Sequence, residues 1–187
     1  VVTVLKAIKI LRKKIGDDVP LVAWAMAPFT LASSLRGVKN MMYDLLRNPE
    51  GVKAILSIAQ ETVIIYTLAL VEAGVDVICL VDPTATGDMI GPKFYNKFAC
   101  LYSKRVVKKI HHVGVPVVLH ICGNSKPIWN YMVETEADML SLGDKIDMAE
   151  AKDKIGDKIS LAGNISPVKV LQQGTPDDVE RAVKGCV

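Results

Sequence analysis

The sequence predicts an α/β fold built on a parallel sheet, because short β-branched runs alternate with longer segments of helical periodicity. Several of the short runs are almost continuously apolar, as expected for strands that are covered on both faces. Half of the 187 residues are hydrophobic but only 5% are aromatic, which suits parallel β/α architecture better than an aromatic-rich sandwich.

Five segments are predicted as strands: 20–27, 75–82, 115–122, 137–143 and 158–164. Helical patterns occupy the segments around them, and these are 1–18, 48–74, 91–114, 126–136, 147–157, 166–174 and 175–187. Cap signals support several of these assignments. Asn48 and Pro49 open one helix and Thr175 and Pro176 open the last one.

A (β/α)8 TIM barrel is the preferred architecture. No GxGxxG or GxxxxGK[ST] motif follows a predicted strand, so a dinucleotide-binding or P-loop fold has no support. A typical barrel has eight strands and about 250 residues. The sequence therefore predicts that residues 1–187 are a fragment of a single TIM-barrel catalytic domain, a partial barrel truncated at both ends.

Composition excludes several classes of protein. The 23 basic and 20 acidic residues give a net charge of only +3, so no nucleic-acid partner is expected. No apolar run is predicted to approach the ~18 residues that span a bilayer, and the first residues lack the pattern of a signal peptide. The four cysteines form no CxxC pair, which favours reduced thiols and a cytoplasmic location.

Polar and unusual residues gather where the predicted strands end. In a parallel barrel these carboxyl ends meet on one face, where barrel enzymes assemble their sites. The pattern therefore indicates an enzyme. The residues are Pro28, Phe29 and Thr30 after the first strand, Asp82 and Pro83 after the second, His120 and Cys122 at the third, and Gly163 and Asn164 at the fifth.

His120 and Cys122 are the candidate metal ligands. Residues i and i+2 of a strand point to the same side, roughly 6–7 Å apart, so an imidazole and a thiolate could converge on one zinc ion. The alternative is a buried cysteine beside a histidine that bonds a backbone carbonyl. Two ligands cannot hold zinc alone, and the residues by themselves leave both interpretations open.

The other thiols and histidines do not complete this site. Cys79 lies inside a predicted strand, and Cys100 and Cys186 lie inside predicted helices. His111 and His112 end a helix, where they suit the negative end of its dipole.

Four longer segments carry a family resemblance: 19–37, 66–98, 115–142 and 159–179. They resemble the uroporphyrinogen decarboxylase superfamily and are most similar to its methylcobamide:coenzyme M methyltransferase branch. The segments "APFTLAS" and "GNISP" are typical of the superfamily, whereas "HICGN" is typical of the methyltransferase branch. The likeness covers nearly the whole chain.

The resemblance implies a TIM barrel with a zinc ion held by His120, Cys122 and a distant cysteine. In the family this third ligand follows a glycine, after a later strand. Cys186 also follows a glycine but falls inside the last predicted helix, so the role is not transferred to it. The third ligand is expected beyond the C-terminus.

The implied activity is methyl transfer from a methylcobamide, presented by a corrinoid protein, to the thiol of coenzyme M. Zinc would hold that thiol as the nucleophilic thiolate. Three alternatives remain: a corrinoid-dependent methyltransferase with another acceptor, a metal-free uroporphyrinogen decarboxylase, and a non-catalytic barrel. The HxC motif counts against decarboxylation.

Three more residues are candidates for this site. Asp82 is predicted as a catalytic residue that orients His120 or contacts the substrate, and the alternative is that this Asp before Pro83 caps a helix or a turn. Asn164 is predicted to bind substrate or to cap the turn that follows it. Thr30 is predicted to line the substrate pocket.

Overall fold

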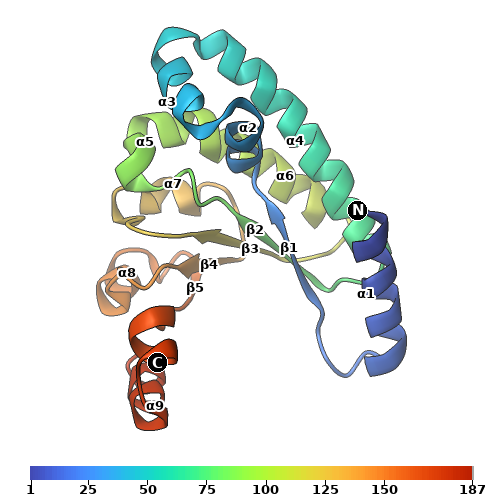
Figure 1. Cartoon of the computed structure of the whole chain (residues 1–187), viewed down its shortest axis with the longest axis vertical. Coiled ribbons are helices and arrows are strands. Elements are labelled where there is room, and N and C mark those ends of the chain that lie inside the picture. Colours follow the sequence, from blue (N-terminus) through green and yellow to red (C-terminus); the bar gives the residue numbers. More distant parts are fainter. Residues whose placement is uncertain (187) are drawn as a thin grey trace.

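The structure is a computed structural model that describes residues 1–186 (Figure 1). Its strands are β1 (Val22–Met26), β2 (Val77–Val81), β3 (Val117–Ile121), β4 (Met139–Leu142) and β5 (Ser160–Ala162). The α-helices are α1 (Val2–Ile15), α2 (Pro28–Arg36), α3 (Val38–Arg47), α4 (Pro49–Glu72), α5 (Gly87–Phe94), α6 (Leu101–His111), α7 (Trp129–Val133), α8 (Met148–Ile155) and α9 (Pro176–Lys184). Shorter turns of other helix types are η1 (Tyr95–Cys100), η2 (Lys126–Ile128) and η3 (Pro167–Gln172).

The five strands form one parallel sheet in the order β1-β2-β3-β4-β5, which is also their order in the chain. Each strand therefore pairs with the next one after a crossover, as in a β/α barrel. Figure 1 shows α2 to α7 gathered on one side of this sheet. The predicted α/β fold and the partial barrel are confirmed.

The two faces of the sheet differ in what covers them. Alternate residues such as Ile78, Leu80 and Leu119 are buried against the helices. The residues between them point to the opposite side, which we call the open face. Register partners on neighbouring strands form rows across this face. The uppermost row is the one nearest the carboxyl ends of the strands, and it consists of Met26, Val81, His120, Ser141 and Ala162.

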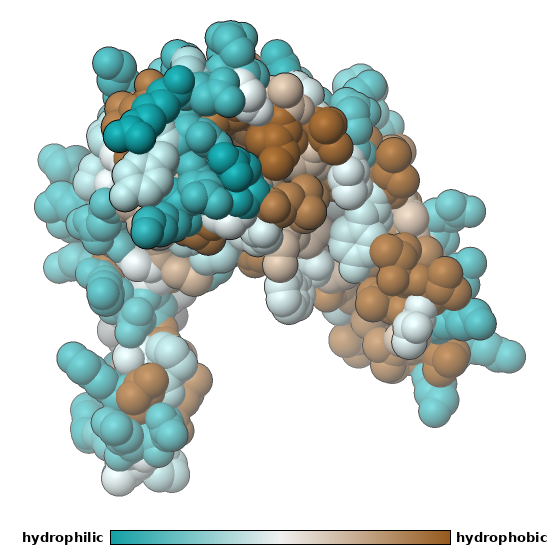
Figure 2. Space-filling model, turned by 45° about the horizontal axis from the view of Figure 1, so that its top comes forward, coloured by the Kyte–Doolittle hydropathy of each residue, from teal (hydrophilic) through white to brown (hydrophobic). Residues whose placement is uncertain are grey.

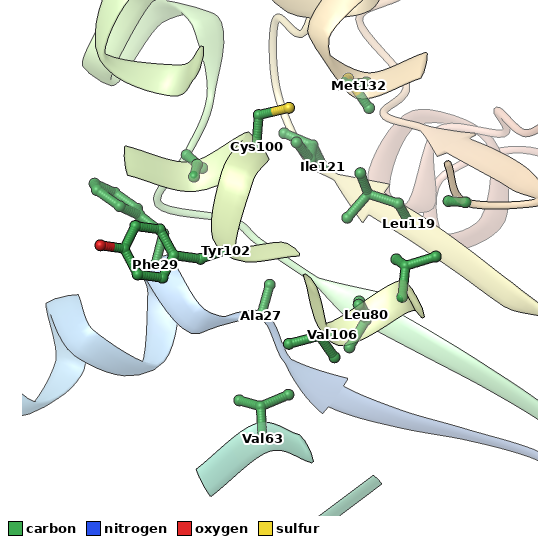
Figure 3. Close-up of a cluster of buried hydrophobic side chains, with 14 of the residues drawn as sticks. Ala27, Phe29, Val63, Leu80, Cys100, Tyr102, Val106, Leu119, Ile121 and Met132 are labelled. Carbon is green, nitrogen blue, oxygen red and sulfur yellow. The ribbon is translucent and has the colours of Figure 1, made fainter. Parts of the chain in front are cut away.

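The hydrophobic core lies between the helices and the covered face of the sheet. Figure 3 shows part of it, where Leu80 and Leu119 from the strands lie near Val63 of α4 and Val106 of α6. Each of these four side chains is at most 3% exposed. The aliphatic core expected from the composition is therefore formed by interleaved strand and helix residues.

All five predicted strands are confirmed, since each observed strand lies inside its predicted range. The predicted helix over 91–114 is interrupted: α5 contains Gly91 with φ 66°, and the π-helical turn η1 separates α5 from α6. The last helix ends at Lys184, so Cys186 follows the helix and does not lie inside it. The prediction for residue 187 lies outside the described residues.

Helices α2 and α3 are not among the predicted elements. Residue Ala27, at the N-cap of α2, provides no side-chain hydrogen bond to the helix. The cap comes instead from Asp82, whose Oδ1 accepts a hydrogen bond of 3.0 Å from the backbone amide of Thr30. A helix start capped from 52 residues away has no local signal in the sequence.

Helix α4 contradicts the prediction that no segment is long and apolar enough to span a bilayer. Among residues 1–186 it passes that test of length and composition. Its packing explains much of this apolar character, because α4 contacts α2, α3, α6 and β1 and buries residues such as Leu56 and Leu70. Hydrophobic residues also reach the surface in the upper part of Figure 2. In α4, the side chains of Ile58 and Ile65 are exposed.

Arg12 fastens α1 to the amino-terminal end of the sheet. Its guanidinium donates hydrogen bonds of 3.0 and 2.8 Å to the carbonyl of Gly74 and also pairs with Asp76. The Asp76 carboxylate accepts a 2.6 Å bond from the amide of Leu21, just before β1. The Leu21 amide and then the Arg12 guanidinium hold the pKa of Asp76 below its usual value.

We predict that Arg12→Ala detaches α1 from this end of the sheet. Charged hydrogen bonds to partly buried groups contribute about 1.5–3 kcal/mol, so amide hydrogen exchange in α1 should become faster by roughly tenfold or more. The matched control is Arg181→Ala, which removes an exposed pair with Asp178 and should cost less than about 1 kcal/mol. Unchanged exchange in α1 would show that Arg12 does not hold this helix.

Candidate functional site

His120 and Cys122 converge on the open face at the carboxyl end of β3. Both residues have the parity that places their side chains on this face, and Cys122 is exposed. The His120 Nε2 and the Cys122 Sγ lie 3.0 Å apart. The structure therefore brings together the two residues that the sequence predicts as metal ligands.

Ser141 contacts the other nitrogen of the same ring. Its Oγ lies 3.0 Å from His120 Nδ1. The two residues are register partners on β3 and β4, so both side chains stand side by side on the open face. Each ring nitrogen thus has its own partner, and the imidazole plane is held between Ser141 and Cys122.

The pair fits two of the positions of a zinc site. Ligand distances of ~2.0 Å for nitrogen and ~2.3 Å for sulfur at a tetrahedral ion imply a separation of roughly 3.5 Å. The 3.0 Å between Nε2 and Sγ is a little shorter, so a small rotation of Cys122 would admit the ion. Within residues 1–186 no three His, Cys, Asp or Glu side chains lie close enough to hold a metal, so these residues supply only two ligands.

A close backbone packing fixes the turn after Cys122. Gly123 has φ 68°, a conformation that favours glycine. A Cβ on Gly143 would lie 2.9 Å from the Gly123 nitrogen. The backbone of the loop after β4 therefore packs directly against this turn. On the other side, Gly87 donates a 3.1 Å hydrogen bond to the Asn124 carbonyl.

Asp82 lies on the other side of the sheet from His120. It continues the parity of Ile78 and Leu80, so its side chain points toward the helices and is 1% exposed. Its Oδ1 accepts hydrogen bonds from the amide and the hydroxyl of Thr30, at 3.0 and 2.6 Å. The prediction that Asp82 orients His120 is wrong, since Ser141 holds that position; a catalytic role for Asp82 stays untested.

Burial dominates the acidity of Asp82. Desolvation raises its pKa to about 7, although the two hydrogen bonds from Thr30 act in the opposite direction. Oδ2 has no hydrogen-bond partner among the described residues. The alternative prediction, that Asp82 caps a helix or a turn, agrees with the structure, in which Asp82 caps α2.

Thr30 is too deeply buried to line a pocket, since its exposed fraction is 4%. Its hydroxyl donates to Asp82 and lies 2.9 Å from the hydroxyl of Thr84. It also accepts a 3.2 Å bond from the Thr84 amide. The predicted lining role is therefore replaced by a structural one, in which Thr30 links the first turn of α2 to the loop after β2.

Asn164 ties two loops together at the edge of the sheet. Its side-chain amide donates to the carbonyls of Gly143 and Ile146, at 2.8 and 2.6 Å. Both amide hydrogens are therefore used inside the protein and cannot be donated to a substrate. The turn that follows is capped by Ser166, so the predicted capping role of Asn164 is wrong, whereas a substrate-binding role through its side-chain oxygen stays a prediction.

Cys79 lies on the open face one row below Val81, opposite Val118, whereas Cys100, Cys186, His111 and His112 make their contacts elsewhere. Cys100 is buried and donates to the carbonyl of Tyr131, and burial raises its pKa to about 11. The Cys186 sulfur accepts a 3.2 Å bond from the amide of Asn164. His111 pairs with Asp138, and His112 Nδ1 lies 2.6 Å from the Lys108 carbonyl.

Comparison with known proteins shows one consistent set of relatives. The profile of a family described as uroporphyrinogen decarboxylase (URO-D) matches residues 1–187. The methylcobamide:CoM methyltransferase MtbA of Methanosarcina mazei is 37% identical over 182 residues, and MtaA of Methanosarcina barkeri, with the same description, is 39% identical over 182. Each alignment covers 97% of this chain and 53% of the relative.

A solved structure from the same genus as these relatives has the same fold as this chain. A methyltransferase from Methanosarcina mazei superimposes with a TM-score of 0.93 at 36% identity, covering 98% of this chain and 54% of that one. The chain therefore spans about half the length of the relatives that it matches.

The raised pKa of Asp82 predicts how stability depends on pH. A folded-state pKa of about 7, against an ordinary value of 3.8, means that folding favours the protonated carboxyl. This stabilisation is complete below pH 3.8 and is lost as the pH rises through about 7. The free energy of unfolding of Asp82→Asn, measured by denaturation, should therefore improve relative to wild type as the pH rises over this range. A difference independent of pH would contradict the prediction.

Proposed function

The chain belongs to the uroporphyrinogen decarboxylase (URO-D) family, and from this premise we propose that the protein containing it is a zinc-dependent methyltransferase. Its substrates are a methylated corrinoid protein and the thiol of coenzyme M. The observation that carries the proposal is the convergence of His120 Nε2 and Cys122 Sγ within 3.0 Å on the open face. The names of the relatives supply the methyl donor and the acceptor.

The residues of the site have distinct roles in this proposal. His120 and Cys122 are metal ligands, and neither acts as an acid or a base. Zinc, when bound, would keep the substrate thiol in its thiolate form, which is the nucleophile. His120 and Cys122 would supply two ligands, and a third would have to come from outside the described residues, which would leave a position for the substrate thiol.

The transfer itself is a nucleophilic displacement. The thiolate sulfur forms a bond to the methyl carbon while the bond from that carbon to cobalt breaks. The electron pair of the broken bond stays on cobalt, which leaves as Co(I). The exposed position of Cys122 at the carboxyl end of β3 is compatible with the approach of a large corrinoid ring presented by another protein.

Three further features belong to the same proposal. Residues 1–187 form part of one TIM-barrel catalytic domain. The location is cytoplasmic, which the four free cysteines favour. Neither a nucleic acid nor a membrane is expected as a partner. The competing reaction is decarboxylation of a porphyrinogen, which needs no metal and would give no role to the pair of His120 and Cys122.

The first test is the metal content of the protein that contains this chain. Wild type should bind about one zinc ion, and His120→Ala or Cys122→Ala should lose the metal together with methyl transfer from methylcobamide to coenzyme M. His112→Ala and Cys186→Ala are matched controls, because neither side chain contacts the pair. Full zinc content in both ligand variants, or release of CO2 from a porphyrinogen, would refute the proposal.

A second test uses the contrast between two thiols. Cys122 is exposed, whereas Cys100 is buried with a pKa of about 11, so an alkylating reagent should modify Cys122 and spare Cys100 in the folded, metal-free protein. Added zinc should then protect Cys122. Mass spectrometry of the alkylated peptides measures both effects, and equal labelling of Cys122 with and without zinc would speak against a metal at this position.

A further inference from the structure

The two nitrogens of His120 face different partners. Nε2 lies 3.0 Å from Cys122 Sγ and Nδ1 lies 3.0 Å from Ser141 Oγ. A neutral imidazole carries a proton on only one nitrogen, so the partner of Nδ1 decides whether Nε2 has a free lone pair. When Nδ1 carries the proton and donates it to Ser141 Oγ, the lone pair of Nε2 is the one that faces Cys122.

The register of the sheet leaves Ser141 as the polar neighbour of this ring. Within the uppermost row of the open face, His120 lies between Val81 and Ser141. Beyond them are Met26 and Ala162, which also lack a hydrogen-bonding group of comparable strength. Among the residues of this row, only the hydroxyl of Ser141 can hold Nδ1.

The strand that carries Ser141 is itself well supported. The loop that follows it packs through Gly143 against Gly123, which is the residue after Cys122. Asn164 holds the Gly143 carbonyl with a 2.8 Å hydrogen bond. Strand β4 thus contacts the ring of His120 through Ser141, and the loop after β4 packs through Gly143 against the turn after Cys122.

We propose that Ser141 is a positioning residue, which accepts a hydrogen bond from the protonated Nδ1 of His120 and so directs the Nε2 lone pair to the metal. This inference rests on the proposed zinc site and adds to it a residue that acts through His120. A hydroxyl can both donate and accept. The ring therefore keeps one orientation when Nε2 faces the thiol of Cys122 and when it faces the ion.

The test compares Ser141→Ala with Ser141→Thr in the full-length protein that contains this chain. Removing the partner of a ligating histidine typically weakens metal binding by about 10- to 100-fold, so zinc affinity in Ser141→Ala should fall by that factor. Threonine retains the hydroxyl and should restore most of the affinity. Competition with a chromophoric zinc chelator measures the zinc affinity of wild type, Ser141→Ala and Ser141→Thr.

A second readout does not depend on the metal. In NMR spectra of the imidazole nitrogens, the signals of His120 are identified by their absence from the spectrum of His120→Ala. In the metal-free protein, the Nδ1 resonance of His120 should shift in Ser141→Ala and stay close to wild type in Ser141→Thr. Loss of a purely structural contact would not give this selective change at one ring nitrogen.

Ser160→Ala is the matched control. Ser160 lies on the same open face, one row below, opposite Met139, and has no hydrogen bond to His120. Its removal should change neither zinc affinity nor the His120 resonances. An unchanged affinity in Ser141→Ala, or an equal loss in the alanine and threonine variants, would overturn the assignment of Ser141.

The His120→Ala variant distinguishes failure of the proposed zinc site from failure of the proposed role of Ser141. If it retains zinc, the proposed metal site is wrong and the role of Ser141 falls with it. If it loses zinc while Ser141→Ala binds zinc as wild type does, the metal site stands and only the positioning role of Ser141 fails.

Discussion

The register of the parallel sheet is the constraint on which the site depends. Because His120 pairs with Ser141 and with Val81, its side chain stands on the open face beside a hydroxyl and not beside a carboxylate. A shift of one residue would turn His120 toward the helices and bring Leu119 to the open face. The chemistry at the end of β3 therefore depends on how the strands align as much as on the residues themselves.

A second layer of interactions lies behind this face and consists of polar groups without direct access to it. The buried Asp82 holds the amide and hydroxyl of Thr30, and Thr30 in turn contacts Thr84. These contacts join the first turn of α2 to the loop after β2, and Asn164 joins the loops after β4 and β5. Residues that look functional by position thus stabilise the loops around the candidate ligands.

The open face is only partly covered, and its apolar side chains include Trp24, which is 63% exposed. Such exposure of large hydrophobic residues is costly in water unless another surface covers them. The relatives are about twice as long and share the fold of this part at a TM-score of 0.93. The pair of His120 and Cys122 is consistent with a site whose remaining parts come from elsewhere in the protein.

The sequence by itself determined the five strands, most helices and the end of the sheet where the site lies, because these follow from local periodicity and strand order. It also identified His120 and Cys122, since the i, i+2 spacing has a defined consequence on any strand. A polar residue in the apolar strand "MLSL" was the available signal for Ser141. Only the tertiary structure decided that Ser141 meets His120, that Asp82 faces the helices, and that α2 begins where Asp82 caps it. These contacts join residues 21 to 52 positions apart, and no local pattern encodes a strand register or a distant cap.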